Sequence, residues 1–285
     1  MVKTTIATAT ANAGTRRACL AALLAALPLL PALAGTPLLI WPIDPVIGPG
    51  QQATALWLEN QGPEAATLQV RVFGWSQPQG EDEFSPQPSV LPSPPIATVA
   101  PGTRQLVRLI ATRPAPPGGE QAFRVFVDEL PAAATASPQA PQSPASPASP
   151  PPGAAGASVN LQLRYAVPLF VYGAGAVPPA ARSRDGTGGP EAGALAPRLD
   201  WKLLFDKGQP TLLLRNTGTA HARVTAVEWR LPDNRPAQVL NPGLLGYVMP
   251  GAAMRFPIDK TPPGGAALRA LLNGRPADIP PRAAD

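Results

Sequence analysis

The chain has 285 residues, with 41 prolines, 26 glycines, 23 lysines and arginines, and 18 aspartates and glutamates. So much proline and glycine argues against a helical protein. The single histidine and the single cysteine exclude a zinc or copper site built from several such ligands, and they leave little material for nucleophilic catalysis.

The first 34 residues are typical of a secretory signal peptide. Basic residues precede an uncharged, Leu- and Ala-rich stretch at 18–33, which is short for a membrane span of about 20 residues. Ala32-Leu33-Ala34 has the small residues that signal peptidase recognises, so we expect cleavage after Ala34. Arg16-Arg17 matches a twin-arginine signal poorly, which favours ordinary secretion.

Cleavage changes the charge and the redox chemistry of the chain. The signal segment holds three of the 23 basic residues and no acidic one, which leaves 20 basic against 18 acidic residues. No basic cluster of the kind that binds nucleic acid remains. The only cysteine, Cys19, is removed as well, so the mature chain forms no disulfide.

The first half of the mature chain alternates short strand-like runs with turns, which is the pattern of a β-sandwich. The alternation is clearest at 67–75, where Leu68, Val70 and Val72 share one face. A polar, proline-rich connection is expected at 81–95. The strands expected in this half are 38–41, 53–58, 67–75, 96–99, 105–110, 123–127 and 159–171.

A second series of strands follows a Gly-, Ala- and Pro-rich stretch at 174–196, which we interpret as a domain linker. The segment 266–272 fits a short helix as well as a strand. We therefore expect an all-β protein with two sandwich domains, at 35–173 and 197–285. The strands expected in the second domain are 201–205, 210–214, 223–229, 238–240 and 253–258.

The segment 131–158 contains 28 residues without a charged or aromatic side chain. Such a composition buries too little apolar surface to offset the loss of chain entropy, so we expect a disordered loop. The run from Val159 to Arg164 then alternates apolar and polar residues strictly. Its apolar members Val159, Leu161 and Leu163 either face the core of their own domain or belong to an open sheet edge that pairs with a partner strand.

Catalytic machinery is not expected. His221 follows a turn and is interpreted as a polar residue at a strand edge, and Asp128-Glu129 as a solvated or ion-paired couple at a strand end. No glycine-rich phosphate loop joins a strand to a helix. The sequence therefore predicts no enzyme, no cofactor or metal, and no small-molecule substrate.

Several segments, in order along the chain, resemble the PapD-like periplasmic chaperones of the chaperone–usher pilus pathway. One is 123–131, FRVFVDELP, which is similar to strand F1 of the family with its acidic-hydrophobic-proline ending. The strand at 161–170 falls where strand G1 of the family lies. Further similarities occur at 47–50, 56–60, 90–109, 214–218 and 247–251.

The resemblance implies a boomerang of two immunoglobulin-like β-sandwiches that binds pilin or fimbrial subunits in the periplasm. In this family, strand G1 completes the sheet of a subunit that lacks a strand, and an outer-membrane usher receives the subunit. Val159, Leu161 and Leu163 would be the donor side chains, and 131–158 the F1–G1 loop of a long-loop member. The sequence at 164–171 resembles the divergent branch of the family that serves spore-coat-U-like or archaic-type pilins. The absence of a disulfide in the loop at 131–158 agrees with that branch.

The resemblance also implies a cationic site for the C-terminal carboxylate of the subunit. Many family members use an arginine on the first strand and a lysine late in G1, but these places hold Pro45 and Pro168 here. Arg164, Arg108 and Arg71 are the candidates that replace them. The alternative interpretation of each is an arginine at the surface or at the edge of the core.

An open G1 edge also allows the free protein to self-associate. Two other functions fit the strand pattern. A structural or adhesive pilus component needs a donor extension, and only 35–37 precedes the first expected strand. A secreted carbohydrate-binding module usually presents clustered aromatic residues on one face, whereas the five tryptophans are spread over separate expected strands.

Overall fold

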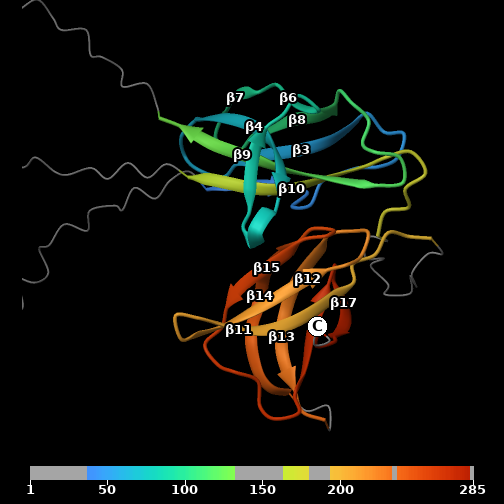
Figure 1. Ribbon diagram of the computed structural model, residues 1–285. Coiled ribbons are helices and arrows are strands. Elements are labelled where there is room, and N and C mark those ends of the chain that lie inside the picture. The colour runs from blue at the N-terminus through green and yellow to red at the C-terminus, as the bar shows by residue number, and fades with distance from the viewer. Residues whose placement is uncertain (1–36, 132–162, 180–192, 233–235, 283–285) are drawn as a thin grey trace, which may run out of the picture. The chain divides into compact units, whose positions relative to one another are not determined.

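The computed structural model describes residues 37–131, 163–179, 193–232 and 236–282. In these residues the chain forms strands and one short 3₁₀ turn, arranged as two immunoglobulin-like β-sandwiches, which confirms the predicted fold class (Figure 1). The signal segment 1–34 and the expected loop beyond Pro131 lie outside the described residues.

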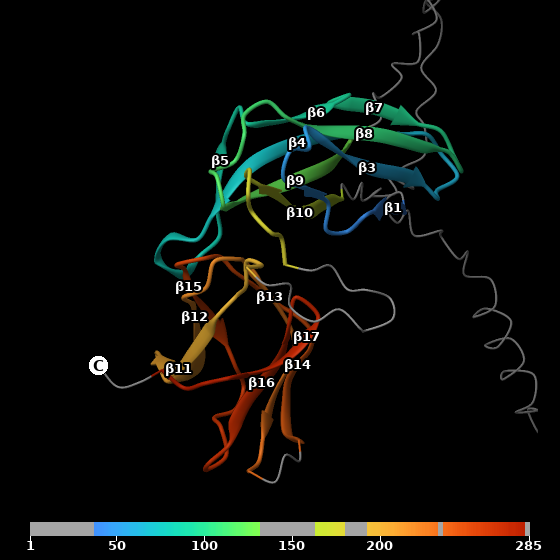
Figure 2. The same ribbon diagram turned by 90° about the vertical axis from the view of Figure 1, so that its right-hand side faces the viewer.

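The first sandwich packs two sheets face to face (Figure 2). Sheet A has the strand order β1-β3-β8-β6, and sheet B the order β2-β10-β9-β4-β5, with β7 also paired to β4. The strands are β1 (Leu38–Trp41), β2 (Val46–Ile47), β3 (Ala53–Asn60), β4 (Ala66–Ser76), β5 (Glu83–Pro86), β6 (Val90–Ser93), β7 (Ile96–Val99), β8 (Arg104–Ala111), β9 (Glu120–Leu130) and β10 (Arg164–Tyr172), and the 3₁₀ turn η1 is Pro78–Gly80.

Alternation along the strands decides which side chains fill the space between sheets A and B. In β4, Leu68, Val70 and Val72 are buried, as the period-2 pattern predicts, whereas Arg71 and Phe73 are only half-buried on the opposite face. The core between the sheets therefore consists almost entirely of aliphatic side chains from both layers.

The second sandwich is smaller and has its own core. Sheet C has the order β11-β12-β15, and sheet D the order β14-β13-β16-β17. Trp229 is fully buried between them and meets Trp201 edge to face, with ring centres 5.0 Å apart. The strands are β11 (Leu199–Asp206), β12 (Gln209–Asn216), β13 (Ala222–Arg230), β14 (Pro236–Val248), β15 (Ala253–Pro257), β16 (Ala267–Leu272) and β17 (Arg275–Ile279).

The strand pairing corrects the expectation for 81–95 and decides between helix and strand for 266–272. The segment at 81–95 is not a plain connection, because it contains β5 and β6, which pair with β4 and β8. These four-residue strands contain proline and have little intrinsic preference for the extended state, so their neighbours in the sheet determine their conformation. The segment 266–272 contains strand β16 and no helix.

A buried asparagine closes one corner of the first sandwich. Asn60, the last residue of β3, is fully buried. Its Nδ2 donates to the carbonyl oxygens of Glu64 (2.6 Å) and Val99 (2.9 Å), and its Oδ1 accepts from the backbone N–H of Gly62 (2.8 Å). Its own carbonyl accepts from the N–H of Gly102 (2.8 Å), so one residue connects two turns.

The second sandwich repeats this corner. Asn216, the last residue of β12, is also fully buried. Its Nδ2 donates to the carbonyl oxygens of Ala220 (2.8 Å) and Val248 (2.9 Å), and its Oδ1 accepts from the N–H of Gly218 (2.9 Å). Its carbonyl accepts from the N–H of Gly251 (2.9 Å). Both domains therefore use the same device to join a strand end to a Pro-Gly turn.

Candidate functional site

Strand β10 has one open side over most of its length. On one side it pairs with β9 along all nine residues, from Arg164 to Tyr172. On the other side it meets β2 only at Phe170 and Val171. Among the described residues no strand pairs with that side of β10 between Arg164 and Leu169. This stretch is therefore an open sheet edge of the kind that accepts a further strand.

The hydrogen-bond pattern shows which backbone groups point to the open side. The carbonyl of Leu163 accepts from Glu129 on β9, whereas the N–H of Phe170 donates toward Pro45 on the other side. Because the direction alternates along an antiparallel pair, the N–H groups of Arg164 and Ala166 point to the open edge. The next residue in this series is Pro168, which has no N–H to donate.

Of the three expected donor side chains, the structure describes Leu163 alone. Its side chain is partly exposed, at 37% of its reference area. It precedes Tyr165, Val167 and Leu169 in the alternation, and these three face the core of the first sandwich. Leu163 is therefore on the same face but beyond the end of the core. Val159 and Leu161 lie outside the described residues.

Two of the three candidate anchor arginines share one carboxylate. Arg71 donates to Asp128 Oδ2 from Nε (3.1 Å) and Nη2 (2.7 Å), and Arg164 donates to Oδ1. Burial opposes ionisation of Asp128, but the hydrogen bonds from the two guanidinium groups hold its pKa below the usual range. The third candidate, Arg108, is exposed on β8 of sheet A and does not belong to this cluster.

Arg124 on β9 is a cationic residue that the sequence interpretation missed. Its side chain is only 10% exposed, and its guanidinium lies 3.6 Å from the ring centre of Trp75. Its nearest carboxylate oxygen is Asp82 Oδ2 at 3.9 Å, and its Nε is buried without a hydrogen-bond partner among the described residues. Burial lowers the pKa of Arg124, and Asp82 opposes this shift. Arg124 stands opposite Pro168 in the β9–β10 ladder.

A tyrosine of β14 lies beside Arg124. The Arg124 guanidinium is 5.6 Å from the ring centre of Tyr247, and Arg223 on β13 lines the same cavity as Tyr247. Burial raises the pKa of Tyr247, and both arginines act against that shift. Next to Tyr247 is a cavity of about 320 Å³. Its lining includes Asp44, Val46, Phe170, Tyr172, His221 and Arg223.

His221 is more than a residue at a strand edge. Its ring lies parallel to that of Phe170, with centres 3.5 Å apart, and its Nδ1 is 2.8 Å from Glu120 Oε2. The backbone N–H of His221 donates to the other oxygen of Glu120 (2.9 Å), and the Tyr172 hydroxyl donates to Oε2 (2.7 Å). Glu120 thus binds both His221 and Tyr172, and Phe170 stacks on the imidazole ring.

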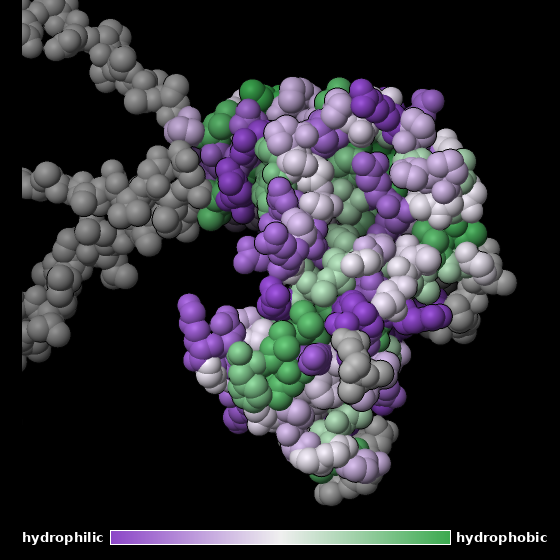
Figure 3. All heavy atoms as spheres, in the orientation of Figure 1, coloured by the Kyte–Doolittle hydropathy of each residue, from purple (hydrophilic) through white to green (hydrophobic). Residues whose placement is uncertain are grey.

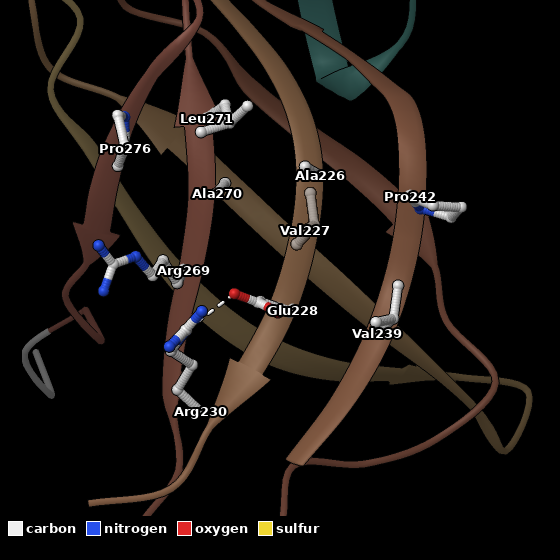
Figure 4. Close-up of a pocket in the computed structure, with 10 residues that line it drawn as sticks. All are labelled: Ala226, Val227, Glu228, Arg230, Val239, Pro242, Arg269, Ala270, Leu271 and Pro276. Atoms are coloured by element: carbon white, nitrogen blue, oxygen red, sulfur yellow. Dashed lines mark hydrogen bonds and ion pairs between the residues drawn. The ribbon is translucent and has the colours of Figure 1, made fainter. Parts of the chain in front are cut away.

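A larger concavity of about 530 Å³ lies on sheet D of the second sandwich (Figure 4). Its charged residues include Glu228 and Arg230, which pair at 2.8 Å, while Val239, Pro242 and Leu271 supply apolar surface. Within the described ranges, no three His, Cys, Asp or Glu side chains are grouped as metal ligands, and no helix is long and apolar enough to span a membrane.

Comparison with known proteins places these features in context. Residues 46–175 match the family model described as pili and flagellar-assembly chaperone, PapD N-terminal domain. A chain of the pre-assembly complex of CsuC and CsuE, a chaperone and a tip adhesion protein from archaic Csu pili of Acinetobacter baumannii, is 29% identical. It has a TM-score of 0.63 and covers 87% of this chain and 100% of its own.

Two further solved structures share the fold at lower identity. A chain of the complex of Salmonella enterica SafA pilin with the SafB chaperone is 15% identical, with a TM-score of 0.53 and coverage of 87% of this chain and 97% of its own. The E. coli chaperone DraB is 15% identical, with a TM-score of 0.50 and coverage of 86% and 98%. No curated protein matches the chain in a sequence comparison.

Proposed function

We propose that this chain, which matches the PapD chaperone family model over residues 46–175, is a pilus-assembly chaperone that binds pilus subunits by lending them strand β10. The observation that carries the proposal is the open side of β10 between Arg164 and Leu169. A subunit that lacks a strand has an open edge of its own, and pairing satisfies the backbone groups of both. The complex also covers apolar surface that would otherwise promote aggregation.

We propose Val159, Leu161 and Leu163 as the side chains that enter the groove of the subunit. Leu163 supports this assignment, because it continues the apolar face of β10 past the core and is partly exposed. Burying three such side chains contributes roughly 1.5–3 kcal/mol each before ordering costs. The gross gain of several kcal/mol is enough to hold a subunit and small enough for exchange at an outer-membrane usher.

The C-terminal carboxylate of the subunit is proposed to bind at Arg124, with Arg223 beside it. Pairing along the open edge ends at Pro168, and Arg124 is the residue opposite Pro168. A carboxylate there would give the buried guanidinium the close partner that Asp82 does not provide at 3.9 Å. Arg164, Arg108 and Arg71 remain the alternative anchors, and the first and last of these already bind Asp128.

Co-expression in a periplasm with candidate pilus subunits tests the strand-lending proposal. We expect soluble subunit to be recovered with the wild-type chaperone and none with Leu161→Glu/Leu163→Glu, because two buried charges would be forced into an apolar groove. Leu91→Glu, a partly exposed leucine of sheet A, is the matched control and should recover as much as the wild type. Equal recovery with the double variant would refute the proposal.

We also propose that the chain acts in the periplasm after removal of its signal peptide, and that it passes subunits to an outer-membrane usher. N-terminal sequencing of the protein from a periplasmic extract is expected to begin at Gly35. A chain that retains residues 1–34 and sediments with the inner membrane would contradict cleavage after Ala34.

The proposal includes no reaction, cofactor, metal or nucleic acid. The matched family is one of assembly chaperones. The tryptophans give no specific support to the carbohydrate-binding alternative. Trp229 and Trp75 are buried, and Trp41 and Trp57 stack on each other at 6.1 Å with Arg104 5.9 Å from each ring.

A further inference from the structure

The outward face of sheet B carries aromatic side chains where a solvated sheet usually has polar ones. Phe126 on β9 contacts Phe73 on β4 at 5.5 Å and Phe84 on β5 at 5.3 Å, both edge to face. Phe84 is 38% exposed. None of the three belongs to the buried core between sheets A and B. The exposed part of these rings, above all that of Phe84, is available to a partner.

Two arginines border these phenylalanines. The Arg71 guanidinium is 5.6 Å from the ring centre of Phe73, and that of Arg164 is 5.4 Å from Phe126. Their side chains are 40% and 60% exposed, and both pair with the carboxylate of Asp128. Glu129 lines the same hollow as the two arginines and Asp128. Aromatic and arginine side chains are the residue types that dominate binding energy at protein interfaces.

The residues Arg71, Phe73, Phe84, Phe126 and Arg164, which we call the Arg–Phe face, extend across sheet B from the open strand β10 to β5 at its other edge. Figure 3 shows strongly hydrophilic residues beside hydrophobic ones on the first sandwich, near the described ends of β9 and β10. Between the open edge of β10 and Phe126 stands Ala166, which pairs with Phe126 across the ladder and is exposed. Its short side chain leaves the phenylalanine accessible from the edge.

We propose that the Arg–Phe face is a second contact site for the same pilus subunit. A strand added at the open edge extends sheet B sideways, so side chains on the matching face of the subunit's own sheet come to lie beside Arg164 and Phe126. The face fits a partner surface with apolar side chains on the phenylalanines and a carboxylate on the guanidinium groups of Arg71 and Arg164. The inference rests on the proposed strand lending, and it makes subunits with an acidic residue beside their open groove the preferred partners.

Two single variants test the Arg–Phe face without disturbing the core. Arg164→Gln removes one guanidinium group while Arg71 still pairs with Asp128, and Phe84→Ser removes an exposed ring from a sheet edge. Each is expected to lower the amount of co-purified subunit about tenfold at low salt, equivalent to ~1.4 kcal/mol. The loss caused by Arg164→Gln should shrink in 0.5 M salt, because screening weakens exposed ion pairs. Arg113→Gln, an exposed loop arginine, is the control and should bind like the wild type.

The outcomes separate this inference from the proposed function. If Arg164→Gln and Phe84→Ser both recover wild-type amounts while Leu161→Glu/Leu163→Glu recovers none, the second contact site is wrong and strand lending stands. If the double leucine variant also recovers wild-type amounts, strand lending itself fails. Thermal unfolding of each free variant shows whether it is folded. If Phe84→Ser does not fold, the result with Arg164→Gln alone decides whether the Arg–Phe face binds the subunit.

Discussion

Replacing Arg124 by glutamine is expected to weaken binding of the last residues of a pilus subunit by about thirtyfold or more. Truncating one partner of a buried, hydrogen-bonded charge pair costs roughly 2–5 kcal/mol of binding energy, and 2 kcal/mol is about thirtyfold in the dissociation constant. The free chaperone should change little in stability, because losing the cation–π contact with Trp75 opposes the gain from removing a buried guanidinium with an unpartnered Nε and only a distant carboxylate. Titration of a peptide with those last residues measures the first effect, and thermal unfolding the second.

A carboxyl-amidated form of the peptide distinguishes the anchor from its neighbours. Amidation should weaken binding to the wild type and have no further effect on Arg124→Gln, since the two changes remove the same contact. With Arg164→Gln, Arg108→Gln and Arg71→Gln the amidation penalty should persist in full. Loss of the penalty in one of those three would place the carboxylate there instead. Arg124→Lys, which keeps the charge, should restore part of the affinity.

Replacing the corner asparagines by alanine is expected to destabilise each sandwich separately. Asn60→Ala leaves two carbonyl groups and one N–H of the first corner unsatisfied, at about 1–3 kcal/mol for each group that stays dry. Such a total is a large part of the roughly 5–15 kcal/mol that stabilises a domain. Asn216→Ala should have at least the same effect in the second sandwich, because Asn216 makes the same three bonds and its Oδ1 also accepts from the backbone N–H of Arg198 (3.1 Å).

Calorimetry of the two variants tests whether each asparagine stabilises its own sandwich. Asn60→Ala should lower the unfolding temperature of one transition and Asn216→Ala that of the other, by similar amounts. Gln61→Ala, an exposed neighbour of Asn60, is the control and should change stability by no more than about 0.5 kcal/mol. A loss below about 1 kcal/mol in both asparagine variants would mean that water replaces the lost bonds.

Much of the fold follows from local signals in the sequence. Alternation in β4 places Leu68, Val70 and Val72 in the core, and the turn residues separate most of the strands that form. The short strands β5 and β6 escape this reasoning, because their extended state depends on pairing with β4 and β8. The asparagines are recognisable as turn residues, but only the folded corner shows that their side chains are buried.

The candidate site was harder to predict for the same reason. Leu163 follows from alternation alone, whereas the role of Arg124 depends on which residues face it across two ladders. Its position opposite Pro168, its stacking on Trp75 and its distance from Asp82 all come from strand register. The phenylalanines of the Arg–Phe face come from three strands that meet only in the sheet.

The missing N–H of Pro168 has a consequence for which polypeptides this protein accepts. Under the proposed strand lending, a subunit strand that pairs along this edge loses one N–H donor at Pro168, whatever its own sequence. Such a sheet edge would select for the position at which the subunit strand ends and would be insensitive to most of its amino-acid sequence. Under the same proposal, one chaperone would serve the different subunits of a single pilus, provided that each of them ends at the same distance from its missing strand.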